Sequence, residues 1–193
     1  MCEKEKQEEN QSLGVLERTL RTRRILLSEE VTSKSAKRII EMLFLLDDDS
    51  AELPIYFFIN SPGGEVNSGL AIYDIMEFIR PQVYTIGSGL VASIASIIYL
   101  QPKKEYRLSL PNAEYLLHQP LGGMQGTASD LEIHANQILK TRSHLNQLIA
   151  DKSGQSLAQV ELSTKRDFWM SASQSMEWGL VGKLMSSSSE LPD

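Results

Sequence analysis

Two side chains in this sequence, Ser93 and His118, could together perform nucleophilic chemistry. Ser93 lies in the predicted first turn of a buried apolar helix, where the positive end of the helix dipole favours an anion developing at its hydroxyl. A serine at that place is also a common helix cap. His118 ends a predicted apolar strand, which suits either a general base at a sheet edge or a core histidine with satisfied hydrogen bonds. The sequence thus offers a nucleophile and a base, and it leaves open whether they react.

The acid that would orient such a base is not identified by spacing. Three aspartates are candidates: Asp130, Asp151 and Asp167. The other histidines, His134 and His144, fall inside a long predicted helix and are expected on its surface. The Gly-x-Ser-x-Gly elbow typical of α/β-hydrolases is absent, because valine and alanine stand two places before and after Ser93.

A glycine turn, Ser61-Pro62-Gly63-Gly64, lies between a predicted strand and a predicted helix. Adjacent glycines permit positive φ and let a ligand approach free backbone N–H groups. The turn could cradle a phosphate or an oxyanion, or it could simply reverse the chain. It is not a P-loop, because no Lys-Ser or Lys-Thr pair follows the second glycine.

Strands and helices alternate along the chain and would position these residues. Predicted strands cover residues 24–27, 54–59, 83–86, 106–110, 114–117 and 168–170. Predicted helices cover residues 33–46, 69–79, 156–162 and 173–178, with a glycine-rich turn before the helix of Ser93. The longest helix is expected to open with the capping box Ser129 to Glu132 and to end near Gly154. This alternation predicts an α/β fold.

Composition and charge exclude several classes of function. The 193 residues include 19 basic and 25 acidic side chains, a net charge of −6 that does not favour a nucleic-acid partner. The single cysteine, Cys2, excludes an internal disulfide framework and a cysteine-rich zinc site. The chain opens without the apolar core of a signal peptide, and the uncharged stretch from 81 to 102 is too rich in Gly, Ser and Pro for a membrane span. We therefore expect a cytoplasmic protein without a membrane partner.

Polar ends flank a single expected domain. Residues 1–14 are predicted to form a flexible charged arm, residues 15–185 one domain and residues 186–193 a polar, frayed tail.

Four segments, taken in chain order, resemble the proteolytic subunit of the Clp protease. They are residues 58–64 (Phe-Ile-Asn-Ser-Pro-Gly-Gly), 91–95 (Val-Ala-Ser-Ile-Ala), 118–123 (His-Gln-Pro-Leu-Gly-Gly) and 165–167 (Lys-Arg-Asp). The resemblance extends over about residues 15–184, and residues 126–140 resemble the long handle helix of that family. It implies a Clp/crotonase-like ββα superhelix, a single peptidase domain with a protruding helix.

The resemblance also implies a role for each site residue. Ser93 falls on the family's nucleophile, His118 on its general base and Asp167 on its orienting acid. The backbone N–H groups of Gly64 and Ile94 fall where the family forms its oxyanion hole. The implied activity is that of a serine endopeptidase that needs neither a metal ion nor an organic cofactor.

Assembly and partners are further implications of the resemblance. Family members form heptameric rings that stack into a tetradecamer, and a hexameric AAA+ unfoldase delivers unfolded polypeptides to it in protein quality control. Three aromatic residues fall where the family docks that ATPase: Tyr56, Phe58 and Phe78. Aromatic residues on a strand and a helix are otherwise ordinary core residues.

Departures from the family pattern favour a second hypothesis. Many members carry an acid where this chain has Lys165, and the acid pairs with the residue equivalent to Arg166 across the ring-to-ring contact. Two identical rings would place Lys165 and Arg166 together, unless a residue such as Glu132 supplies the acid. Ala95 also stands where the family usually has glycine. The alternative is a weakly active or structural ring subunit that works only in a mixed particle with a paralogous subunit.

A crotonase-type acyl-CoA enzyme shares the implied fold and a backbone oxyanion hole. A crotonase-type activity explains an oxyanion-binding N–H at Gly64, but it assigns no role to Ser93, His118 and Asp167.

Overall fold

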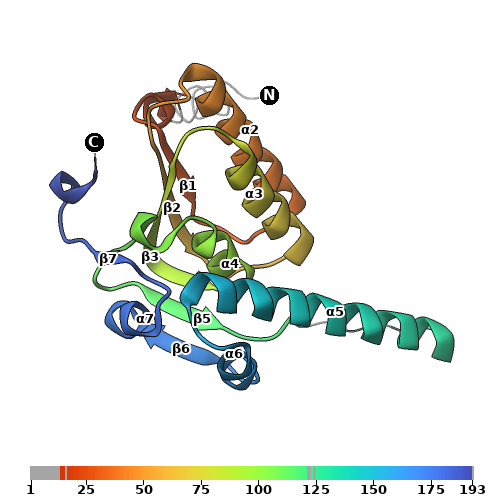
Figure 1. The fold of residues 1–193 in the computed structure, drawn as a ribbon. Coiled ribbons are helices and arrows are strands. Elements are labelled where there is room, and N and C mark those ends of the chain that lie inside the picture. Colours follow the sequence, from red (N-terminus) through yellow and green to blue (C-terminus); the bar gives the residue numbers. More distant parts are fainter. Residues whose placement is uncertain (1–13, 16, 121–122, 124, 193) are drawn as a thin grey trace, which may run out of the picture.

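Five strands form the main path of the sheet in this computed structural model, which describes residues 14–15, 17–120, 123 and 125–192 (Figure 1). Their order is β1 (Arg24–Leu27), β2 (Ile55–Ser61), β3 (Val83–Ala92), β4 (Arg107–Ser109) and β7 (Lys183–Leu184). Each neighbouring pair on this path is parallel. Parallel neighbours need crossover connections, which helices supply here, so the predicted α/β architecture is confirmed.

The sheet forks at β3, which pairs with two strands along one edge. Residues 85–87 pair with β4, and residues 90–92 pair with β5 (Glu114–Leu117). β6 (Phe168–Ser171) then adds to β5 in the antiparallel direction. The fork brings the carboxyl end of β5 and the start of β6 to the place where β3 ends.

The glycine-rich segment within β3 is strand, and the turn predicted there is wrong. A side chain at Gly87 would overlap the hydroxyl of Tyr115. Gly89 has a φ of 63° and lies against Asn60, whose Oδ1 accepts a hydrogen bond from the N–H of Leu90 at 3.0 Å. These glycines serve close packing and a local bend inside a strand. Sequence composition does not separate that use from a turn.

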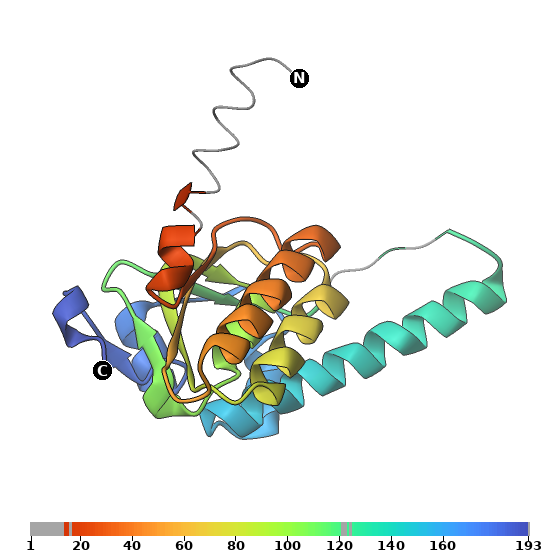
Figure 2. The same cartoon turned by 90° about the horizontal axis from the view of Figure 1, so that it is seen from above.

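Alternating burial along β2 distinguishes the two faces of the sheet. Ile55, Phe57 and Ile59 are fully buried, whereas Tyr56 and Phe58 are half-buried. The buried face forms the main core with α2 (Ser33–Asp49), α3 (Val66–Phe78) and α4 (Ile94–Leu100). α2 and α3 lie side by side along that face (Figure 2).

The long helix α5 (Ala128–Ser153) projects from the body of the molecule, as expected (Figure 2). Its buried residues all belong to its last third: Leu145, Asn146, Ile149 and Ala150. The projecting part exposes several apolar side chains: Leu131, Ile133 and Leu139. His134 and His144 are exposed on this helix, and that prediction is confirmed.

α5 begins two residues earlier than the predicted capping box. Its N-cap is Thr127, whose hydroxyl accepts from the N–H of Asp130 at 3.3 Å. Asp130 in turn accepts from the Thr127 N–H at 3.2 Å, and its hydrogen bonds with Thr127 hold the pKa of its carboxyl below the usual value. Thr127 and Ser129 both precede an acid by three positions, so the pattern fits either start. The helix ends as predicted at Gly154, which has a φ of 78°.

Two short helices and a terminal turn complete the described chain. The helices are α6 (Leu157–Ser163) and α7 (Ala172–Trp178). Where a polar tail was expected, Ser188–Glu190 forms a 3₁₀ turn, and Leu191 packs on a small cluster on the outer sheet face. Residues 1–13 of the expected arm lie outside the described residues. The described chain contains no helix long and apolar enough to span a membrane.

Candidate active site

Ser93 occupies the junction between β3 and α4 in a strained backbone conformation. Its φ of 57° and ψ of −127° are unusual for a residue with a side chain. Its N–H donates to the carbonyl of Leu116 on β5 at 2.9 Å, which fixes the junction to the fork in the sheet. Among the described residues its hydroxyl has no hydrogen-bond partner, so Ser93 is not the side-chain cap of α4. The fold thus presents an uncommitted hydroxyl on a fixed, strained turn.

The glycine turn packs directly against Ser93. A Cβ on Gly63 would lie 2.6 Å from the Cβ of Ser93 and 3.2 Å from the N of Ile94. The turn is held by Val31, whose N–H donates to the Gly63 carbonyl at 2.7 Å. Within the described chain, the N–H groups of Gly64 and Ile94 have no acceptor. Two uncommitted amide donors therefore lie at or beside the Gly63–Ser93 contact.

A Gly63→Ala variant should have a lower melting temperature and lose activity by about 10²-fold in kcat, the size of effect produced by a small misplacement in an active site. The φ of 92° at Gly63 disfavours any side chain, and the new methyl group would push on Ser93. Peptidase assays and thermal unfolding would measure the two effects. Gly123→Ala is the matched control, since a Cβ there meets none of the described residues within 4 Å. Wild-type kcat in Gly63→Ala would show that the turn does not shape the site.

His118 and Asp167 face each other because of the register between β5 and β6. Leu117 pairs with Phe168 in this antiparallel ladder, so the residue after Leu117 lies opposite the residue before Phe168. His118 Nδ1 is 3.3 Å from Asp167 Oδ1. The His118 side chain is 19% exposed and that of Asp167 is 63% exposed. This ladder brings together two residues that are far apart in the sequence.

The other two candidate acids are engaged elsewhere. Asp130 caps the projecting end of α5, and Asp151 accepts a hydrogen bond from Gln147 near the opposite end of that helix. Of the three aspartates, the structure pairs Asp167 with His118.

Ser93 and His118 line the same small pocket, whose remaining walls are apolar. These walls come from α3, α4, α5 and the end of β5: Val66, Ile94, Ile97, Leu117, Pro120, Leu145 and Ile149. No hydrogen bond joins Ser93 to His118 in the described chain. Such bonds are often long without substrate and tighten when substrate binds. The pocket can thus bring the Ser93 hydroxyl and the His118 imidazole to one reacting carbonyl, with Asp167 held against the imidazole from outside the pocket lining.

The residues expected at partner contacts lie outside this pocket. Tyr56 and Phe58 belong to the outer face of the sheet, next to the cluster of Ile86, Leu108 and Met185. Phe78 is not part of that cluster; it lies at the end of α3 and is 77% exposed. Tyr56 stacks on Tyr84, with ring centroids 5.7 Å apart.

Lys165 and Arg166 are exposed on the loop between α6 and β6. Neither forms an ion pair with another described residue. Glu132 is exposed on the projecting part of α5.

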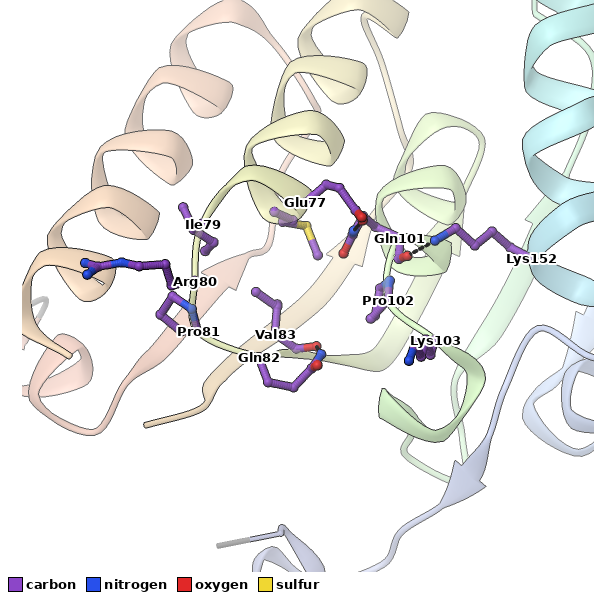
Figure 3. Close-up of a pocket in the computed structure, with 11 residues that line it drawn as sticks. Glu77, Ile79, Arg80, Pro81, Gln82, Val83, Gln101, Pro102, Lys103 and Lys152 are labelled. Atoms are coloured by element: carbon purple, nitrogen blue, oxygen red, sulfur yellow. Dashed lines mark hydrogen bonds between the residues drawn. The ribbon is translucent and has the colours of Figure 1, made fainter. Parts of the chain in front are cut away.

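A larger cavity of about 340 Å³ lies between the C-terminal ends of α3 and α4 and the start of β3 (Figure 3). Two of its three basic side chains, Lys152 and Arg80, are already engaged. Lys152 donates to the Gln101 carbonyl, and burial lowers the pKa of its ammonium group. Arg80 Nε donates to Asp47 at 3.0 Å. The cavity lies at the C-terminal ends of α3, α4 and α5, and none of the candidate catalytic residues lines it.

The sequence did not indicate how two residues beside the site are used. It placed Gly63 in the glycine turn that could cradle an anion, and the packing of Gly63 against Ser93 is visible only in the structure. Asn146 lies at 4% exposure among the apolar residues of α5. An asparagine at an apolar helical spacing signals a buried hydrogen bond, and that signal was present in the sequence.

Comparisons with known proteins identify the class that this fold and site define. A family model described as Clp protease matches residues 6–188. The ATP-dependent Clp protease proteolytic subunit 2 of Treponema pallidum is 49% identical over 173 residues, covering 90% of this chain and 87% of that protein. The subunit of the same name from Treponema denticola is 42% identical over 191 residues, covering 99% and 96%.

A solved structure agrees with these sequence matches. A mutant of ClpP1 from Listeria monocytogenes superposes with a TM-score of 0.85 at 38% identity, covering 91% of this chain and 98% of that one. The chain belongs to the Clp protease family. It is a proteolytic subunit, a peptidase of the serine type.

Proposed function

We propose that the chain hydrolyses peptide bonds with Ser93 as nucleophile, His118 as general base and Asp167 as orienting acid. The observation that carries this proposal is the 3.3 Å contact between Asp167 and His118, since His118 lines the same pocket as the strained Ser93. Family membership supports the same assignment, since the four segments that resemble the family contain these three residues.

The reaction is an acyl transfer in two halves. As Ser93 Oγ bonds to the peptide carbonyl carbon, its proton passes to His118 Nε2 while Asp167 accepts the hydrogen bond from Nδ1–H. His118 then gives the proton to the leaving amine as the C–N bond breaks. In the second half, His118 takes a proton from water, the resulting hydroxide attacks the ester, and Ser93 recovers its proton. No metal ion or cofactor takes part.

The N–H groups of Gly64 and Ile94 receive the oxyanion in this proposal. They are uncommitted among the described residues and border the contact between Gly63 and Ser93. Each such donor contributes about 3 kcal/mol to the transition state in comparable sites. Because the donors are backbone groups, the isoleucine side chain at position 94 does not affect their chemistry.

A proteolytic subunit of this family works as an oligomer with an ATPase partner. The finer proposal is a cytoplasmic pair of heptameric rings fed with unfolded polypeptides by an AAA+ unfoldase. Tyr56 and Phe58 support a docking site on the outer face of the sheet, because they are half-buried aromatics beside an apolar cluster. The exposed Phe78, at the end of α3, would make a further contact with the ATPase.

The experiment that tests the catalytic assignment is labelling with a fluorophosphonate probe, followed by peptide mapping of the modified residue. Modification of Ser93 supports the assignment. Modification at another serine, or none in a particle that hydrolyses peptides, contradicts it.

Lys165 supports the alternative that this subunit works in a mixed particle with a paralogous subunit. Two exposed cations at a ring-to-ring contact repel, at a cost of about 1 kcal/mol for each pair.

We expect the wild type alone to form single rings, and Lys165→Glu to form double rings with higher peptidase activity. Native mass spectrometry with a peptidase assay measures both. Lys165→Gln, which removes the charge without supplying an acid, should be intermediate; a wild type that is already a stable, active double ring overturns the idea.

A further inference from the structure

A buried polar contact ties α5 to the loop that leads to Asp167. Thr164 is 1% exposed and Asn146 is 4% exposed. The Thr164 hydroxyl lies 3.0 Å from the side-chain oxygen of Asn146 and 2.9 Å from the carbonyl of Val160 in α6. Thr164 is therefore held between two helices, α5 and α6.

The contact is a hydrogen bond in either orientation of the amide. A hydroxyl has one proton to donate and can also accept. If Thr164 donates to Asn146, the amide oxygen accepts; if it donates to Val160, the amide turned by half a rotation donates its N–H to the hydroxyl oxygen. Both arrangements hold Thr164 to α5.

Thr164 in turn holds the strand end that bears His118. The N–H of Gln119, the next residue, donates to the Thr164 carbonyl at 2.9 Å. The Gln119 side-chain amide donates to the Lys165 carbonyl at 3.3 Å. Thr164 thus lies three residues before Asp167 in the sequence, and its carbonyl accepts a hydrogen bond from the residue that follows His118.

The same stretch of α5 forms part of the pocket wall. Leu145 and Ile149, which flank Asn146 on the helix, line the pocket that contains Ser93 and His118. A single rigid segment therefore carries both the apolar wall and the asparagine that reaches Thr164.

We infer that Asn146 and Thr164 are positioning residues, which set the distance between His118 and Asp167 by fixing the loop to α5. This inference rests on the proposed roles of His118 and Asp167. It predicts that breaking the contact lowers kcat while leaving KM nearly unchanged, because the substrate pocket persists while the base loses its alignment.

A purely structural role makes a different prediction, and one pair of variants separates the two. Thr164→Val and Asn146→Leu each remove one partner at nearly constant size. Thr164→Val leaves the Asn146 amide buried without this partner, whereas Asn146→Leu leaves the Thr164 hydroxyl with only the Val160 carbonyl. The double variant Thr164→Val/Asn146→Leu removes both partners and leaves no orphaned polar group. If the contact only satisfies buried groups, the double variant recovers the activity that the single variants lose.

The experiment measures kcat, KM and melting temperature on assembled particles of the wild type and these variants. We expect each single variant to lose at least tenfold in kcat, and the double variant to regain melting temperature but not kcat. Thr164→Ser, which keeps the hydroxyl, should retain kcat within about threefold. Ser163→Ala is the matched control, since its hydroxyl lies one residue away and contacts Gln159 within α6.

Two results would overturn the inference. One is a kcat within twofold of wild type in the double variant, which is the variant most able to fold. The other is a His118–Asp167 distance in the structure of that variant that equals the wild-type distance. Failure of the triad assignment is recognised separately, because it appears as labelling of a serine other than Ser93 in the wild type.

Discussion

A Ser93→Ala variant is expected to hydrolyse peptides about 10⁶-fold more slowly than the wild type, the loss observed when a serine protease triad loses its nucleophile. The hydroxyl on the strained turn between β3 and α4 is the atom that would bond to the substrate carbonyl. Alanine tolerates that turn no worse than serine, and Ser93 donates no side-chain hydrogen bond within the described chain, so the fold should persist. Peptide hydrolysis and fluorophosphonate labelling should disappear together while the melting temperature stays near the wild-type value.

Ser88→Ala is the matched control for this experiment. Ser88 belongs to β3, the strand that leads into Ser93, and its hydroxyl makes only a long contact of 3.4 Å with the carbonyl of Ile59. It should retain labelling and activity. Labelling that survives Ser93→Ala in a correctly assembled particle would mean that another residue is the nucleophile.

Asp167→Asn is expected to lower kcat by about 10³-fold with little change in KM. A buried triad loses about 10⁴-fold on this change, because the amide can donate to the imidazole and select the wrong tautomer. The Asp167 side chain is 63% exposed, so water can replace part of the lost hydrogen bond and the loss should be smaller.

Steady-state kinetics on the assembled particle would measure this effect. Asp151→Asn is the control, because this aspartate was a candidate from the sequence and its side chain accepts a hydrogen bond only from Gln147 among the described residues. Equal activity of Asp167→Asn and wild type would remove the aspartate from the mechanism and leave His118 without an orienting acid.

The sequence predicted the fold class because its strands and helices have clear periodicities. β2 alternates buried and half-buried residues, and α5 ends at a glycine in the left-handed conformation. The start of α5 was wrong because its capping pattern fits two positions, whereas the strand boundary at the glycine-rich segment depended on packing. Gly87 makes room for the Tyr115 hydroxyl inside a strand, and no local pattern reveals this partner.

The site was only partly predictable for the same reason. Ser93 and His118 could be named from residue type and setting, but physical reasoning did not choose among Asp130, Asp151 and Asp167. The choice depends on the antiparallel register of β5 and β6, a long-range pairing that sequence periodicity does not determine. The resemblance to the family supplied that choice, and the contact between His118 and Asp167 agrees with it.

The backbone of Ser93 has a consequence for how this chain can change over time. A positive φ at a residue with a side chain costs on the order of 1–3 kcal/mol, which the surrounding structure has to offset. Glycine would relieve that cost, so selection for stability alone would favour Gly at this position. With Ser93 as the proposed nucleophile, catalysis is what would keep a serine at a position that suits glycine, and we expect a lineage released from catalysis to lose the serine early.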